Sequence, residues 1–205
     1  MVNDVDFAVN TINRVLLENA LPEISREDYR RLFGFPVRDY YERIGFDFSS
    51  HRFEVVGTRF IEIYNSGAKD LDLFEGVPEL MSGLRSSGKR HAILSAGQQS
   101  HLDEMLDHFK LSDHFDHICG IDNHYAASKV DRGKELMKLW NVDLKETVMV
   151  GDTDHDLEVA KALGIEIILV ADGHQSYERL SSLHDKVLET RFPARAVGDL
   201  FMSKA

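Results

Sequence analysis

Short apolar runs alternate with helical patterns in the part of the chain after Leu73, and this feature constrains the fold most. The strand-like runs are RHAILSAG, FDHICGI, ETVMVGD and IEIILVADG, and the helical stretches between them are SHLDEMLDHFKL, RGKELMKLWNV and LEVAKALG. Such β-α alternation is typical of a parallel sheet with helices on its faces. The strands are nearly continuous apolar runs, as expected when both faces of the sheet are covered. We therefore predict an α/β fold.

The residues before this alternation show helical periodicity with short breaks and no convincing strand. Apolar residues recur at helical spacing in the first stretch, and Pro22 lies just beyond its expected end. Ser25 is suited to cap the next helix. Two further helical stretches are VRDYYERIG and HRFEVVGTRFIEIYNSG. We expect a helical unit over residues 1–72 and an α/β unit over residues 73–205.

The residues that directly follow each predicted strand are the candidate site residues, because ligands of parallel sheets bind at the carboxyl ends of the strands. The first such end is Ser95-Ala96-Gly97. A hydroxyl followed by main-chain N–H groups at a turn into a helix can hold a phosphate oxygen. The alternative, in which these small residues serve only the turn, stays open.

An acidic cluster follows the third predicted strand, in the run Gly151-Asp152-Thr153-Asp154-His155-Asp156. Carboxylates this close repel one another unless positive charge lies between them. Mg²⁺ supplies that charge, and it takes one or two carboxylates together with water and phosphate oxygens. We predict that Asp152 and Asp156 serve a metal site, whereas Asp154 is better explained as a helix cap. The alternative for the whole cluster is capping and solvation.

Lys129 precedes the helix that begins near Asp131. From this position a lysine can reach back to an anion at the strand ends. A lysine before a helix is more often solvated, so its position alone assigns it no role.

The charge balance argues against nucleic acid as a partner. The chain of 205 residues has a formal net charge of −11, whereas nucleic-acid binding needs clustered lysine and arginine. A local pocket can still be positive, so an anionic substrate remains compatible. The sequence contains no run of about 18 apolar residues, so no membrane span is predicted. The N-terminus also lacks the basic start of a signal peptide. We expect a cytoplasmic protein with no membrane partner.

These candidate residues occur in an order that resembles phosphatases of the haloacid dehalogenase superfamily. The family carries a serine or threonine after one strand, a lysine before a later helix, and GDxxxD after the next strand. The matching segments here are HAILSAG, ASKVDRGKEL and GDTDHDLEVAKALG. The resemblance is closest to the subgroup of phosphoglycolate phosphatase and β-phosphoglucomutase. It implies a Rossmann-like parallel sheet core over residues 73–205 and a four-helix cap over residues 1–72.

The resemblance also implies an activity, which is Mg²⁺-dependent hydrolysis of a phosphomonoester in a small phosphorylated metabolite. Ser95 and the N–H groups of Ala96 and Gly97 would hold the phosphoryl group. Lys129 would neutralise charge beside it.

In the same resemblance, Asp152 would bind Mg²⁺, and Asp156 would support the ion or its water shell. The cap would close over the substrate and select it. Arg38, which follows Gly34-Phe35-Pro36, is a candidate substrate contact in the cap. A surface salt bridge is an equal alternative for this arginine.

The chain departs from the family at its N-terminus. Family members open with a strand and DxDGT, whose first aspartate attacks phosphorus and whose second acts as acid and base. Here MVNDVDFAVNTIN resembles the start of the cap, and neither Asp4 nor Asp6 fits the motif. We expect activity to be impaired in this chain because the nucleophile segment is absent. Either the natural protein is longer, or the gap is repaired in another way, for example by a partner chain.

Other functions remain open on the sequence. One is a non-catalytic phosphate- or metal-binding protein that assembles with a partner. A second is a phosphomutase of β-phosphoglucomutase type, which shares the layout. A two-component receiver domain fits less well, because its acidic cluster lies near its beginning and it has no helical cap. The sequence specifies neither the substrate nor the oligomeric state.

Overall fold

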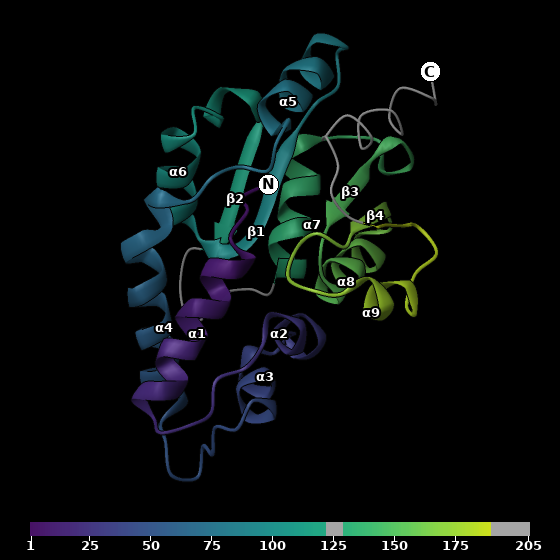
Figure 1. The fold of residues 1–205 in the computed structure, drawn as a ribbon. Coiled ribbons are helices and arrows are strands. Elements are labelled where there is room, and N and C mark those ends of the chain that lie inside the picture. Colours follow the sequence, from purple (N-terminus) through teal and green to yellow (C-terminus); the bar gives the residue numbers. More distant parts are fainter. Residues whose placement is uncertain (122–128, 190–205) are drawn as a thin grey trace.

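A computed structural model describes residues 1–121 and 129–189. Helices at the start of the chain form one part of the molecule, and parallel strands with their covering helices form the other (Figure 1). The strands that pair are all parallel, which confirms the predicted α/β class. Within the described ranges, no helix is both long and apolar enough to cross a membrane.

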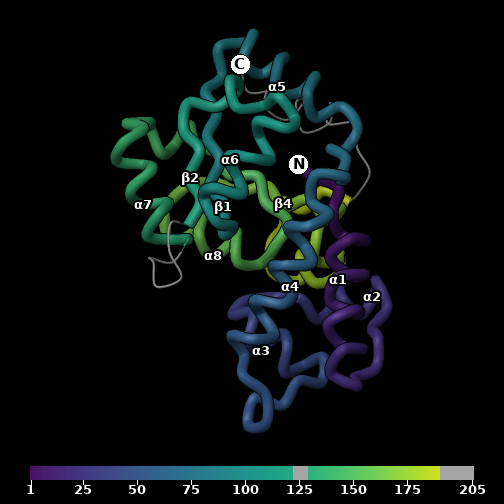
Figure 2. Tube along the Cα trace, turned by 90° about the vertical axis from the view of Figure 1, so that its left-hand side faces the viewer, coloured from purple at the N-terminus to yellow at the C-terminus, as the bar shows by residue number. Residues whose placement is uncertain are grey.

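The first part, here called the N-terminal helices, is built around one apolar cluster. Its members are α1 (Val5–Glu18), α2 (Arg26–Leu32), α3 (Val37–Arg43) and α4 (Phe53–Gly67). The helices α1 and α4 run side by side, and α2 and α3 lie toward the end of the molecule opposite α5 (Figure 2). The predicted cap is confirmed, since the Ser25 hydroxyl accepts a hydrogen bond from the Asp28 N–H at 3.0 Å.

The second part contains the strands and the remaining helices. The strands are β1 (Ala92–Gln98), β2 (His117–Ile121), β3 (Val148–Gly151), β4 (Glu166–Val170) and β5 (Val187–Leu188). The α-helices are α5 (Val77–Ser86), α6 (Gln99–His108), α7 (Lys129–Trp140), α8 (Asp154–Leu163) and α9 (Tyr177–Ser181). Three 3₁₀ turns complete the described elements: η1 (Ala68–Asp70), η2 (Ser112–His114) and η3 (Leu144–Glu146).

The strands form two sheets rather than the single sheet predicted from the alternation. One has the order β1-β2 and the other the order β3-β4-β5, so among the described residues β1 and β3 each have a strand neighbour on one side only. Exposure follows this arrangement. Val150 of β3 is 45% exposed, whereas Leu169 of the central strand β4 is 0% exposed.

Helix α7 connects the two sheets and brings their carboxyl ends to one edge. At its first turn, the Lys129 ammonium donates to a carboxylate oxygen of Asp156, after β3, at 2.5 Å. One turn later, Arg132 Nε donates to the carbonyl of Gly120 in β2 at 3.0 Å. A side chain at Gly133 would collide with leucines of β1 and α8, so glycine permits this close packing. Ligands that approach either strand end therefore meet the start of α7.

The two ends of the N-terminal helices meet beside the strands. Val2 pairs with Leu73 in an antiparallel bridge, and the Asn3 N–H donates to the Asp72 carbonyl at 2.9 Å. This contact lies where the sequence predicts the change from the helical unit to the α/β unit. It places the start of α1 next to the strand ends.

Candidate functional site

The end of β1 carries the predicted phosphate-binding residues. Residues 92–94 pair regularly with β2, and pairing resumes at Gln98, so the register shifts across Ser95, Ala96 and Gly97. The strand therefore continues to Gln98, where the sequence predicted a turn. The Gly97 N–H donates to the Ser95 hydroxyl at 3.0 Å, which orders this short exposed stretch.

The neighbouring end of β2 packs tightly against the same stretch. The Gly120 N–H donates to the side-chain oxygen of Gln99 at 2.6 Å. A side chain at Gly120 would collide with the main chain of Gln99 and with the carbonyl of Gly97. Because residue 120 is glycine, the main chain of Gly97 and Gln99 can pack closely against β2.

Lys129 and Asp156 form a buried ion pair at the end of β3. Their side chains are 12% and 6% exposed, and the nitrogen and oxygen lie 2.5 Å apart. Thr153 is the N-cap of α8, and its hydroxyl exchanges hydrogen bonds with Asp156 in a capping box. The second Asp156 oxygen also accepts the N–H groups of Asp152 and Thr153 at 3.1 and 3.0 Å.

These contacts decide the charge of Asp156. Burial raises the pKa of this carboxyl, but the Lys129 ammonium and the Thr153 hydroxyl outweigh that effect and hold the pKa below its usual range. Asp156 is therefore ionised, and both of its oxygens are engaged. Its geometry suits a brace for Lys129 and for the main chain at Asp152 better than a direct metal ligand.

Asp152 presents the carboxylate at the strand end. One of its oxygens accepts the main-chain N–H of His174 at 2.7 Å. Carboxylate oxygens are donors that Mg²⁺ prefers. Among the residues that the structure describes, no three His, Cys, Asp or Glu side chains are grouped to hold a metal. The donor set therefore fits an ion that Asp152 would hold together with water and a bound phosphate, as is common for Mg²⁺.

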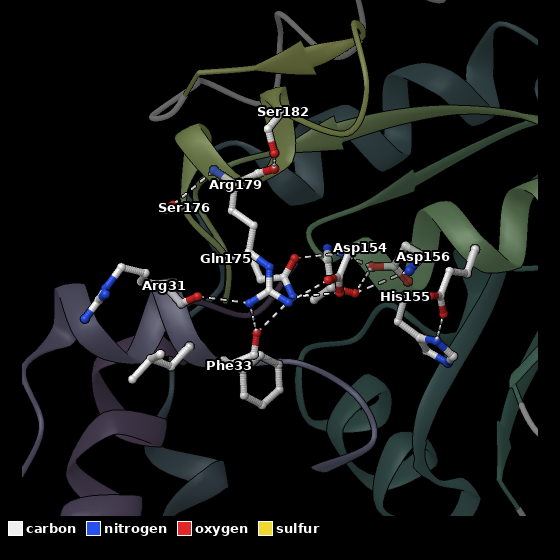
Figure 3. A network of polar contacts seen from close by, with 12 residues as sticks. Arg31, Phe33, Asp154, His155, Asp156, Gln175, Ser176, Arg179 and Ser182 are labelled. Carbon is white, nitrogen blue, oxygen red and sulfur yellow. Dashed lines mark hydrogen bonds and ion pairs between the residues drawn. The ribbon is translucent and has the colours of Figure 1, made fainter. Parts of the chain in front are cut away.

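Asp154 has a different role from the helix cap predicted for it, because Thr153 is the cap. Its carboxylate accepts from Arg179 at 2.6 Å and from the side chain of Gln175 at 2.8 Å. Arg179 and Gln175 both reach the carbonyl of Phe33, just after α2, at 2.6 and 3.0 Å (Figure 3). Asp154 thus ties the acidic run to the N-terminal helices.

A partly buried polar cluster lies beside Asp152 and was missed from the sequence. Its members are His174, Asp4, Tyr29 and Tyr64. The His174 ring contacts the Tyr29 hydroxyl at 2.9 Å and an Asp4 oxygen at 3.4 Å, and the Tyr64 hydroxyl donates to Asp4. His174 lies in the loop after β4 and directly follows the predicted strand run IEIILVADG, so the rule applied to the ends of the first and third strands would have found it at the fourth.

Charges within this cluster are paired. Burial would lower the pKa of His174, but the Asp4 carboxylate, with help from Asp152, raises it above the usual range. Burial would raise the pKa of Asp4, but His174 and the Tyr64 hydroxyl lower it below the usual range. The two side chains therefore form an ion pair between the start of α1 and the loop after β4.

Arg38 lies in α3, and its contacts belong to the N-terminal helices. Its guanidinium is 3.3 Å from Glu42 and lies over the ring of Phe48 at 5.4 Å. An open cavity of about 500 Å³ borders this pair, lined by Arg38, Glu42, Phe46, Asp47, Phe48 and Ser49. The structure brings Ser95, Lys129 and Asp152 to one edge of the sheets, whereas Arg38 is held within the helices by the salt bridge that was its alternative role.

Comparisons with known proteins show similarity in sequence and in fold. A family model described as haloacid dehalogenase-like hydrolase matches residues 1–170. The chain is 26% identical over 180 residues to a phosphoglycolate phosphatase of Caulobacter vibrioides, covering 85% of this chain and 76% of the relative. It is 32% identical over 103 residues to the tyrosine-protein kinase PtkA of Mycobacterium tuberculosis, covering 50% of this chain and 35% of the relative.

A solved structure has the same fold over nearly its full length. A predicted phosphatase from Clostridium acetobutylicum superposes with a TM-score of 0.82 at 18% identity. The match covers 99% of this chain and 94% of that chain. The agreement extends to the N-terminal helices as well as to the parallel strands.

Proposed function

Because the chain belongs to the haloacid dehalogenase-like hydrolases, we propose that it is a Mg²⁺-dependent phosphomonoester hydrolase acting on a small phosphorylated metabolite. The observation that carries this proposal is the buried Lys129–Asp156 pair directly beside Asp152. It sets a fixed positive charge next to a carboxylate at the carboxyl ends of parallel strands, where such sheets bind their ligands. The phosphatase relative, matched over most of both chains, supports the same reaction.

The phosphoryl group would be held by residues from both sheets. The Ser95 hydroxyl and the main chain of Ala96 and Gly97 would donate to its oxygens at the end of β1. Lys129 would face the same oxygens from the start of α7, and Asp156 would keep its ammonium in place. Fixed donors aimed at developing negative charge lower the barrier to phosphoryl transfer, because they need no reorganisation during the reaction.

Asp152 would hold the metal ion. A bound Mg²⁺ would polarise the phosphoryl oxygens and neutralise the charge that develops on them. Asp156 would act on Asp152 through the main chain rather than as a direct ligand, since its oxygens already accept from Lys129, Thr153 and the Asp152 N–H.

The N-terminal helices would act as the cap that selects the substrate, with its boundary at residues 72–73. A cavity of about 200 Å³ lies between the end of α4 and α6, and Gln98, which follows the phosphate-binding stretch, is part of its lining. The other lining residues are Asn65, Lys69, Ser100, His101, Glu104 and Met105. Its size and polar lining support a small, polar leaving group. Arg38 would be a secondary contact that requires release from Glu42.

The test is phosphate release from a panel of small phosphomonoesters by the 205-residue protein, with and without Mg²⁺. DxDGT does not occur in the printed sequence, so we expect slow hydrolysis that depends on positioning and electrostatics. Asp152→Asn should lower the Mg²⁺-dependent rate by at least tenfold. Asp113→Asn, on an exposed 3₁₀ turn, is the matched control and should leave it unchanged. Equal rates for the wild type and Asp152→Asn would refute the proposal.

A second candidate is a non-catalytic phosphate- and metal-binding protein that assembles with a partner. The observation that favours it is the partial exposure of β1 and β3, each of which lacks a second strand neighbour in the described residues. This candidate predicts Mg²⁺-dependent binding of inorganic phosphate with no release from any ester in the same panel.

A further inference from the structure

The loop after β4 closes directly on the Asp152 carboxylate. The His174 N–H donates to Asp152 Oδ2 at 2.7 Å. A side chain at Gly173 would overlap the same carboxylate oxygen, so only glycine permits this approach. The position of one Asp152 oxygen is therefore set by the main chain at residues 173–174.

The imidazole of His174 is held by the N-terminal helices. Nδ1 lies 2.9 Å from the Tyr29 hydroxyl of α2, and Nε2 lies 3.4 Å from Asp4 at the start of α1. Asp4 in turn accepts from the Tyr64 hydroxyl of α4. The ring thus contacts α2 and the start of α1 directly and α4 through Asp4, while the main chain of His174 contacts Asp152.

The main chain on both sides of His174 is fixed from α2 as well. Arg30 donates to the carbonyls of Ala171, Gly173 and Gln175, and the Ser176 N–H donates back to the Arg30 carbonyl. Because these contacts hold the loop without the imidazole, loss of the ring should shift the loop locally rather than release it.

From these contacts we infer that His174 is a positioning residue for Asp152. The imidazole transmits the placement of the N-terminal helices to the carboxylate, so divalent-cation binding depends on those helices even though Asp152 belongs to the α/β part. This inference rests on the proposed metal-binding role of Asp152. Partners that orient metal ligands typically change metal affinity by about 10- to 100-fold when removed.

The experiment is an EPR titration of the 205-residue protein with Mn²⁺ alone, and unfolding is measured on each variant. His174→Ala should weaken Mn²⁺ binding by at least tenfold. Tyr29→Phe removes one hydroxyl and keeps the ring, so it should weaken binding by a smaller factor in the same direction. If His174→Ala does not fold, the Mn²⁺ affinity of Tyr29→Phe tests the inference instead. Phosphate binding without metal should be unchanged in both variants, which a general structural effect would not produce.

Arg179→Gln is the matched control. It breaks the contacts with Phe33 and Arg31 and the ion pair with Asp154 without touching the imidazole. Since it removes a positive charge near Asp152, Mn²⁺ binding should not weaken. Equal weakening in Arg179→Gln and His174→Ala, or wild-type affinity in both His174→Ala and Tyr29→Phe, would overturn the inference. Asp152→Asn distinguishes failure of the proposed metal site from failure of the positioning role of His174. If this variant binds Mn²⁺ like the wild type, Asp152 is not the metal ligand and the inference about His174 fails as well.

Discussion

At the scale of residues, Lys129 and Asp156 depend on each other. Both side chains are almost fully buried, at 12% and 6% exposure, so each charge is compensated chiefly by the other. Asp156 also accepts three hydrogen bonds from residues 152–153. The pair therefore contributes to stability and to the geometry of the site at the same time.

Removal of one partner should be costly. Lys129→Met and Asp156→Asn each strand a buried charge, so we expect each to lower the free energy of unfolding by about 3–5 kcal/mol. The double variant should lose less than the sum of the two, because it leaves no uncompensated charge. Urea unfolding at pH 7 measures all three, and losses below about 1 kcal/mol in both single variants would contradict the buried pair.

The pH dependence has a defined sign. The pKa of Asp156 is lower in the folded protein than in the unfolded chain, so its contribution to stability is present above the ordinary aspartate pKa of about 4 and is lost as pH falls below it. Unfolding measured from pH 7 to pH 3 should show a steeper loss for the wild type than for Asp156→Asn. Parallel curves would show that Asp156 titrates normally.

At the scale of elements, periodicity predicted the long helices and the first four strands, because their apolar patterns repeat over several residues. It missed α9 and β5, which span five and two residues and carry no readable period. It also predicted one sheet where the described chain has two. Strand pairing depends on neighbours far along the chain, so a local pattern cannot specify it.

The exposed strand β3 gives a matched test. Leu169→Ala should cost about 2–5 kcal/mol, since it empties a fully buried position in β4. Val150→Ala should cost less than about 1 kcal/mol, because that side chain is 45% exposed and removes little buried area. Similar losses for the two variants, measured by chemical unfolding, would mean that β3 is covered in solution.

At the scale of the whole molecule, the N-terminal helices are tied to the loop after β4. Position after a strand indicated Asp152, whereas the roles expected for Ser95 and Lys129 came from the order of motifs in the family resemblance. The contacts of Arg30 and Tyr29 with residues 171–175 join positions more than 140 apart. No local signal marks such contacts, so the sequence could have indicated His174 by its place after a predicted strand but not the partners that hold it.

The contacts between α2 and the loop after β4 can be tested by hydrogen exchange. Arg30→Gln removes the donors to residues 171–175, so the amides of His174 and Ser176 should exchange faster while those inside α1 stay protected. Arg26→Gln on the same helix is the control, because Arg26 pairs with the exposed Asp6 of α1. Faster exchange throughout the N-terminal helices in both variants would indicate general loosening instead of a local tie.

The central claim is that Ser95, Lys129 and Asp152 form one site for phosphate and a divalent cation. Calorimetric titration of inorganic phosphate, with and without Mg²⁺, tests it most directly. Mg²⁺ should tighten phosphate binding by at least tenfold in the wild type and leave it unchanged in Asp152→Asn, while Ser95→Ala should weaken binding in both conditions. Phosphate affinity that is the same with and without Mg²⁺, or that ignores both substitutions, would contradict a shared site.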